Sequence, residues 1–137
     1  MIKSISVNMP AFKIDVSQDG QVVRTITNCS FGRDGHRTPI IANGSLSMAK
    51  RDRLHKSSIY KDEQGAPAIM PYALFFEQDL SCAFHEGNPQ LASHGCIHLT
   101  EPDAQWLFNW AAHDPVALHM SGPYPVPPVK AQPGPSA

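Results

Sequence analysis

The chain has 137 residues, of which 42% are hydrophobic and 17% charged, and its formal net charge is -1. This length suits one folded domain, and the balanced charge argues against a nucleic-acid-binding protein and against a membrane-surface protein. No run approaches the roughly 18 apolar residues that cross a bilayer. The first residues also lack the apolar core of a signal peptide, so we expect a chain that is cytosolic at birth, exported by another route, or trimmed.

The first third of the chain has the pattern of a β-hairpin. Residues 12–16 alternate apolar and polar side chains, as a strand with one buried face does. The pair Asp19-Gly20 tolerates the positive φ of a tight turn, and residues 22–27 return as the partner strand. Residues 32–35 then predict a loop.

Residues 44–62 are polar and mixed, and they contain a basic cluster of Lys50, Arg51, Arg53 and Lys56. Two interpretations stay open. The segment is either a solvated loop or exposed hairpin, or a patch that meets the carboxylates of an anionic substrate.

Two further strands are expected at residues 72–76 and 80–85, joined by a short turn. Side chains alternate between the two faces of a strand. In the second strand, one face carries Leu80, Cys82 and Phe84, and the other carries Ser81, Ala83 and His85. Cys82 is therefore predicted to be a core thiol, and His85 to emerge on the opposite side at the strand's end.

A helix is predicted after Leu99. Thr100 is suited to the N-cap, and Pro102 and Asp103 suit the first turn. Ala104, Leu107, Phe108 and Ala111 recur at helical spacing and should face the core. Residues 116–120 then read as the last strand.

The C-terminal segment, residues 122–137, contains six prolines in sixteen residues. Such a segment cannot join a sheet and is expected to be extended or disordered. We therefore predict one folded domain over residues 1–121.

The three cysteines, Cys29, Cys82 and Cys96, are an odd number and form no Cys-x-x-Cys pair. A bridge between Cys29 and Cys82 stays open, since spacing alone does not fix the separation of their Cα atoms. In that arrangement Cys96 keeps its thiol.

Several residue types needed for cysteine nucleophilic catalysis gather around Cys96. His85 and His94 offer imidazoles that exchange protons near neutral pH. Gly95 leaves room for a substrate carbonyl next to the thiol, and the nearby helix N-terminus would help to stabilise a thiolate if it points that way. A polar cluster of this density is poor material for a hydrophobic core.

Zinc binding is the competing interpretation. His85, His94, Cys96 and His98 are four side chains of types that zinc accepts, but the His-x-Cys-x-His spacing is not that of common zinc modules. The remaining histidines, taken singly, are interpreted as surface or satisfied core residues: His36, His55, His113 and His119.

The segment Ala-Ser-His-Gly-Cys-Ile-His-Leu at residues 92–99 closely resembles the Ser/Thr-His-Gly-Cys signature of L,D-transpeptidase catalytic domains of the YkuD type. Residues 36–39, 55–60, 70–76 and 84–85 also resemble, in order, the segments that lead to that family's active site. The resemblance covers about residues 7 to 121.

The resemblance implies a mostly β, sandwich-like catalytic domain with one or two short helices and a cysteine site in a cleft under a hairpin lid. It implies acyl transfer on peptidoglycan stem peptides in the periplasm or cell wall, without a cofactor or metal. Cys96 would attack the diaminopimelate–D-alanine bond and form a thioester. An amine of a neighbouring stem would then resolve the thioester into a 3→3 cross-link.

Site residues follow from the same resemblance. Catalysis is assigned to Cys96 as nucleophile, His85 as its general base and His94, which shapes the site. Substrate binding is assigned to Ser93, Gly95, Tyr72 and His98, and the Gly95–Cys96 backbone is expected at the oxyanion position.

Three departures from the family pattern bear on the second half-reaction. Only residues 86–92 separate His85 from Ser93, where the family often has a longer stretch, His98 stands where Arg or Asn is commoner, and Ile40-Ile41 replaces a usual Thr-Gly. The alternatives are therefore an L,D-carboxypeptidase or D-amino-acid exchange enzyme, including an exported antibacterial effector, and a non-catalytic or zinc-binding wall-associated domain.

Overall fold

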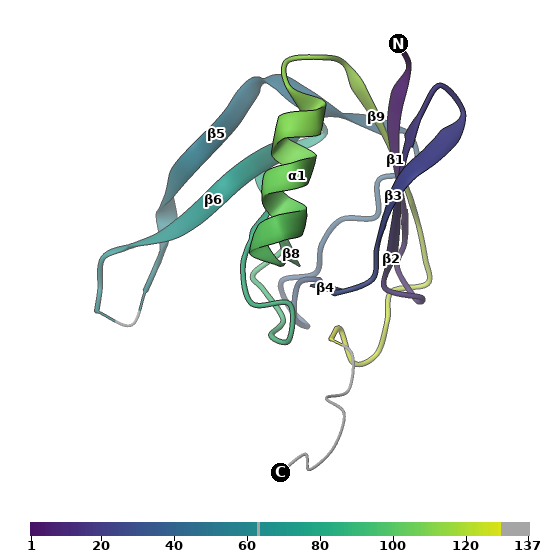
Figure 1. Cartoon of the computed structure of the whole chain (residues 1–137). Coiled ribbons are helices and arrows are strands. Elements are labelled where there is room, and N and C mark those ends of the chain that lie inside the picture. The colour runs from purple at the N-terminus through teal and green to yellow at the C-terminus, as the bar shows by residue number, and fades with distance from the viewer. Residues whose placement is uncertain (63, 130–137) are drawn as a thin grey trace.

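The computed structural model describes residues 1–62 and 64–129. The strands are β1 (Lys3–Asn8), β2 (Lys13–Gln18), β3 (Gln21–Ile26), β4 (Cys29–Ser30), β5 (Gly44–Lys61), β6 (Pro67–Phe76), β7 (Asp79–Glu86), β8 (Ile97–Leu99) and β9 (Val116–Ser121). Within the described residues they form one mixed sheet in the order β3-β2-β1-β9-β5-β6-β7-β8-β4, accompanied by one helix, α1 (Glu101–Ala111) (Figure 1). The predicted fold class, mostly β with a short helix, is confirmed.

The long strand β5 joins the two halves of the sheet. Gly44 and Ser45 pair with β9, whereas residues from Leu46 onward pair with β6. One core cluster combines side chains of β1 and β2 with side chains of β7, β8 and α1. The two halves therefore bury a common interior.

The predicted first hairpin is present as β2 and β3. Asp19 and Gly20 form its turn with φ values of 53° and 83°, which explains the Asp-Gly pair. Phe12 lies outside β2, because its φ is 50° and its ring turns inward to stack on Phe31 at 5.1 Å.

The interpretation of residues 44–62 as a solvated loop is wrong, and the alternative of an exposed hairpin is correct. Strand β5 runs for 18 residues and pairs antiparallel with β6. The outer part of this hairpin extends beyond the rest of the sheet (Figure 1). Both of its faces meet solvent over much of that length, so the sequence lacks the alternation of a half-buried strand.

The core of β7 follows the predicted alternation. Cys82 is 6% exposed and packs with Phe84 in the main cluster, which confirms it as a core thiol. Leu80, predicted on the same face, is 44% exposed. The ladder between β6 and β7 shifts register at Phe75/Phe76, which interrupts the regular alternation near that end of the hairpin.

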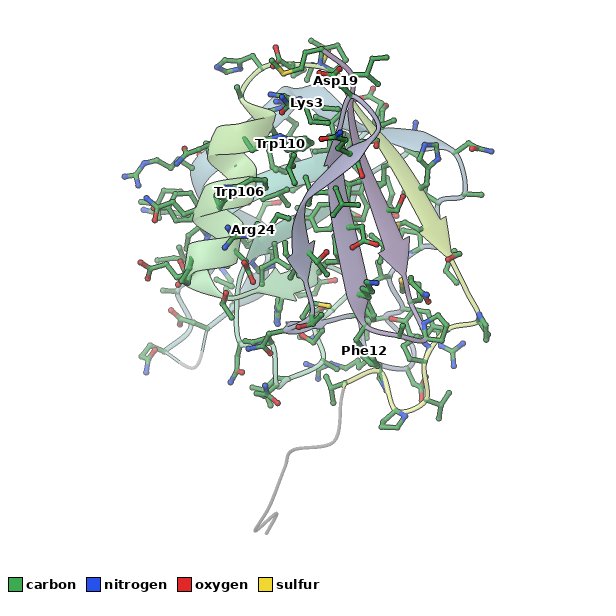
Figure 2. The ribbon with its side chains drawn as sticks, turned by 45° about the vertical axis from the view of Figure 1, so that its right-hand side comes forward. Lys3, Phe12, Asp19, Arg24, Trp106 and Trp110 are labelled. Carbon is green, nitrogen blue, oxygen red and sulfur yellow. The ribbon has the colours of Figure 1, made fainter. Side chains whose placement is uncertain are left out.

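Helix α1 begins as predicted, with the Thr100 hydroxyl accepting a hydrogen bond from the Asp103 N–H. Two cations fix its outer side to the sheet (Figure 2). Arg24 of β3 lies over the Trp106 ring at 4.9 Å and bonds Asp103, and Lys3 of β1 lies 5.1 Å from the Trp110 ring. The two indoles stack between these cations. This bracing also fixes the position of β8, which leads directly into the helix.

Part of the segment predicted as a tail packs on the domain. The Tyr124 hydroxyl donates to the Gly32 carbonyl at 2.5 Å and accepts from the Thr38 N–H at 3.1 Å. The Arg37 guanidinium lies over the same ring. The rest of the predicted tail, residues 130–137, lies outside the described residues. No helix in the described part of the chain is long and apolar enough to cross a membrane.

Candidate active site

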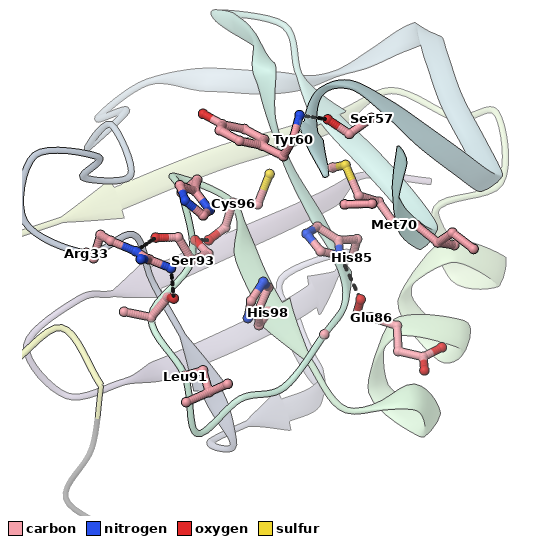
Figure 3. A pocket seen from close by; sticks show the side chains of 15 residues that line it. Arg33, Ser57, Tyr60, Met70, His85, Glu86, Leu91, Ser93, Cys96 and His98 are labelled. Atoms are coloured by element: carbon pink, nitrogen blue, oxygen red, sulfur yellow. Dashed lines mark hydrogen bonds between the residues drawn. The ribbon is translucent and has the colours of Figure 1, made fainter. Parts of the chain in front are cut away.

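The parallel pairing of β7 and β8 assembles the candidate site. His85 is opposite His98, and Phe84 is opposite Ile97. Continued by one residue, this register sets Cys96 beside Ala83, whose small side chain leaves space on that face. Cys96, His85, His98, Ser93 and His94 all line one cavity of about 620 Å³ (Figure 3). A volume of this size suits a small-molecule or peptide ligand.

Ser93 holds the turn that presents Cys96. Its hydroxyl donates to the Cys96 carbonyl at 2.5 Å and accepts from the Gly95 N–H at 3.0 Å. Its backbone bonds Phe31 and Arg33, and only 4% of the residue is exposed. The serine therefore serves the shape of the turn, and the Gly95 N–H is already engaged within it. Gly95 has φ 127°, a backbone conformation that side chains disfavour.

His85 is buried, and one hydrogen bond determines which of its ring nitrogens carries the proton. Its Nδ1 lies 2.7 Å from the Glu86 carbonyl oxygen, which only accepts hydrogen bonds, so Nδ1 carries the hydrogen and Nε2 is the basic nitrogen. Burial, with a smaller effect of the neighbouring His98, lowers the pKa of His85 to about 4. The imidazole is therefore neutral at neutral pH, and its Nε2 carries no proton.

The Cys96 thiol rests against the edge of β7, where it donates to the Ser81 carbonyl over 3.9 Å. Burial raises the pKa of Cys96 to about 11, partly offset by a hydrogen bond from the Ala83 backbone. This shift favours the protonated thiol at neutral pH. The strand β8 also separates Cys96 from the N-terminus of α1. Because a strand rises about 3.3 Å per residue, the thiol lies outside the short range over which the helix dipole acts.

The pKa shifts of Cys96 and His85 favour the same resting state of the two side chains. The pKa values of Cys96 and His85, about 11 and about 4, differ by about 7. Burial disfavours both charged groups, so both shifts favour the neutral thiol and neutral imidazole over a thiolate–imidazolium pair. The resting site therefore holds a thiol and a neutral imidazole.

The other two histidines have separate positions. His94 is exposed at the rim, where it stacks on Tyr60 of β5 at 4.5 Å and meets the His36 ring edge-on. His98 packs edge-on against His85 at 5.0 Å, and its Nδ1 donates to the Asn88 carbonyl at 3.0 Å. His98 thereby ties the short segment after β7 to the site.

Residues 2–118 match the family model described as the L,D-transpeptidase catalytic domain, YkuD. This chain belongs to the YkuD L,D-transpeptidase family. No curated protein sequence matches the chain.

Solved structures show the same fold in other YkuD-type proteins. The L,D-transpeptidase from Stackebrandtia nassauensis is 18% identical with a TM-score of 0.72, over 91% of this chain and 58% of that one. Mycobacterium tuberculosis L,D-transpeptidase 1 is 24% identical with a TM-score of 0.66, over 88% and 62%. This YkuD chain thus spans about six tenths of the length of these relatives.

Tyr72, assigned to substrate binding from the resemblance, lies elsewhere in this YkuD domain. Its ring packs on Phe108 of α1 at 5.9 Å and under the Arg53 guanidinium. Alternation along β6 puts Tyr72 on the core face with Leu74 and Phe76, and its positive φ of 56° breaks that alternation toward Met70. Met70 therefore shares the site face with Ala73 and Phe75, and Tyr72 turns away.

Arg33, Tyr60 and Met70 line the cavity but were not assigned to it from sequence. Arg33 comes from the loop after β4, and its side chain holds the Ser93 and Ala92 carbonyls. Tyr60 lies on β5 and Met70 lies on β6, the two strands of the same hairpin. No local pattern marks these residues, because their place depends on how the hairpin folds over the site.

In the described residues, no group of three or more His, Cys, Asp or Glu side chains could hold a metal ion. The rings of His98 and His85 use a nitrogen each on backbone carbonyls, and His94 stacks at the rim. The zinc interpretation therefore has no arrangement of side chains to support it in this part of the chain.

Alkylation separates the three thiols. We expect iodoacetamide to modify Cys96 in the folded protein and to spare Cys29 and Cys82, which are 0% and 6% exposed. Because burial raises the pKa of Cys96 to about 11, the rate should rise about tenfold per pH unit from pH 7 to pH 9. Mass spectrometry of peptides measures the three sites, and equal labelling of all three in the folded protein would contradict the assignment.

Proposed function

We propose that this chain is a peptidoglycan L,D-transpeptidase in which Cys96 is the nucleophile and His85 its general base. The proposal depends most on one observation, the Nδ1–H of His85 fixed on the Glu86 carbonyl at 2.7 Å. That bond leaves Nε2 as the proton acceptor in the same cavity that the Cys96 thiol lines.

The first half-reaction follows from the neutral resting pair. Cys96 Sγ attacks the carbonyl carbon of the diaminopimelate–D-alanine bond while its proton passes to His85 Nε2. The carbonyl oxygen becomes an oxyanion, for which the Cys96 N–H is the nearest candidate donor, because the Gly95 N–H is bonded to Ser93. The C–N bond then breaks, His85 returns the proton to the departing D-alanine amine, and a thioester remains.

The second half-reaction uses the same base. An amine of a neighbouring stem transfers a proton to His85 as it attacks the thioester, and the proton then returns to Cys96. Concerted proton transfer avoids a free thiolate, which the raised pKa of Cys96 disfavours. This sequence forms one amide for each amide broken, so it needs no cofactor.

Water as the acceptor is the second candidate function, giving an L,D-carboxypeptidase. The short segment between β7 and Ser93 favours it, because Leu91 at the cavity edge is 59% exposed and offers little cover to the site. A free D-amino acid as acceptor would give an exchange enzyme by the same route.

Purified tetrapeptide stems test the proposal. We expect the intact protein to gain the mass of the acyl group at Cys96, and the products to contain cross-linked stems. Replacing Cys96→Ala should abolish both, since neither Cys29 nor Cys82 lines the cavity. Tripeptide products alone would favour the carboxypeptidase, and no Cys96-dependent product would exclude both functions.

A further inference from the structure

A second, smaller recess lies on the other side of the thiol. Its volume is about 60 Å³, and Lys50, His55, Phe75, Ser81 and Cys96 are among its walls. His85 lines the larger cavity and not this recess. Cys96 therefore stands between a large space containing the base and a small space containing a cation.

Lys50 is held in place at this recess. Its ammonium lies 4.1 Å from the centre of the Phe75 ring and donates to the Leu80 carbonyl at 2.8 Å. An ammonium has three hydrogens, so this contact leaves donors for another acceptor. Two charges act on the thiol from this side: Asp79 raises the pKa of Cys96, and Lys50, with a smaller effect, lowers it.

The rest of the basic cluster is directed elsewhere. Arg51 bonds the Ser47 and Asp114 carbonyls and lies against the end of α1. Arg53 lies over the Tyr72 ring, and Lys56 is exposed. Lys50 is thus the member of the cluster that lines the recess.

The recess has the size and charge for one small anion. A water molecule takes about 30 Å³ in the liquid, so the space suits about two waters or a single carboxylate group. Of the nearby acids, Asp52 pairs with His55, and Asp79 accepts two hydrogen bonds from Ser81. Neither acid lines the recess.

Proton transfer decides which part of a substrate enters the recess. The departing amine must receive its proton from His85, so the leaving group occupies the larger cavity. The acyl residue lies on the other side of the scissile carbonyl, and the subsite requires its side chain to extend away from His85 and toward Lys50. A diaminopimelate side chain ends in a carbon that carries both a carboxylate and an amino group, and the carboxylate is the group that a lysine can pair with.

We propose that this recess is a carboxylate subsite for the side chain of the acyl-donor residue, with Lys50 Nζ as the ion-pair partner. The proposal rests on the proposed function and deepens it. It makes Lys50 a specificity residue that distinguishes stems with a free side-chain carboxylate from stems in which that group is a carboxamide.

Binding to a chain that cannot react tests the subsite directly. Dissociation constants are measured by calorimetry for acid and carboxamide stems, in Cys96→Ala and in Cys96→Ala/Lys50→Met. The acid stem should bind about tenfold more weakly after Lys50→Met, while the carboxamide stem changes little. Lys50→Arg should keep most of the preference, and Lys56→Met, an exposed lysine on the same strand, is the matched control.

The outcomes separate the two proposals. Equal weakening of both stems, or unchanged binding of the acid stem, overturns the subsite. Thioester formation at Cys96 in the otherwise unchanged protein is measured in parallel. A thioester without Lys50-dependent discrimination overturns the subsite alone, whereas discrimination without a thioester overturns the proposed function alone.

Discussion

Replacing His85 with asparagine is expected to slow thioester formation at Cys96 by about 10²–10⁴-fold, the usual contribution of general acid–base catalysis. Asparagine can still donate to the Glu86 carbonyl that now accepts from His85 Nδ1, but it has no group at the position of Nε2. The buried neutral thiol then has no base, and its raised pKa of about 11 leaves few thiolates at pH 7. Single-turnover mass spectrometry of the acyl-enzyme measures the rate.

The pH dependence of acylation distinguishes a base from a merely structural histidine. The pKa of His85 is lowered to about 4 from a reference near 6.5, so the neutral, basic form persists as the pH falls from 7 to 5. The wild-type acylation rate should therefore fall only as the pH nears 4, where His85 becomes protonated. The pH–rate profile of His85→Asn should lack this fall at acid pH. His119→Asn, on β9 outside the cavity, is the control. A His85→Asn rate within a few-fold of wild type would contradict the mechanism.

The sequence predicts the site where the local pattern is regular. Alternation in β7 places His85 and Ala83 on the face opposite Cys82, and the structure keeps that arrangement because Cys82 and Phe84 fill the core. The Thr100 cap and the apolar stripe of the helix also follow from local rules. The parallel pairing of β7 with β8, which brings Cys96 to the same face, depends on tertiary contacts and was not predicted; only the family resemblance paired His85 with Cys96.

The rest of the site could not be read from local patterns. Tyr72 shares the core face with Leu74 and Phe76, and the positive φ at Tyr72 brings Met70 onto the cavity face. The polar β5 strand has no alternation, so neither Tyr60 nor Lys50 could be placed. The protonation of the Cys96 thiol depends on how deeply it is buried. The residues next to Cys96 in the sequence do not reveal that burial.

Gly32→Ala is expected to disrupt the turn that presents Cys96, although Gly32 lies outside the Ser-His-Gly-Cys segment. A Cβ at Gly32 would lie 2.0 Å from the His36 carbonyl oxygen and 2.9 Å from the Gly95 Cα and N. All three atoms are backbone, so no flexible side chain can move aside. Overpacking of this kind typically destabilises by about 1–3 kcal/mol. Because one of the two clashes is with Gly95, we also expect thioester formation to fall by at least tenfold.

Gly20→Ala provides the matched control for this variant. Gly20 has φ 83° in the β2–β3 turn, but a Cβ there meets nothing within 4 Å. Alanine should therefore lower stability by about 1 kcal/mol through backbone strain alone and leave the acylation rate unchanged. Urea unfolding and single-turnover acylation measure the two effects separately. If Gly32→Ala folded and acylated as fast as Gly20→Ala, the close approach of Gly32 to Gly95 would not hold the nucleophile in place.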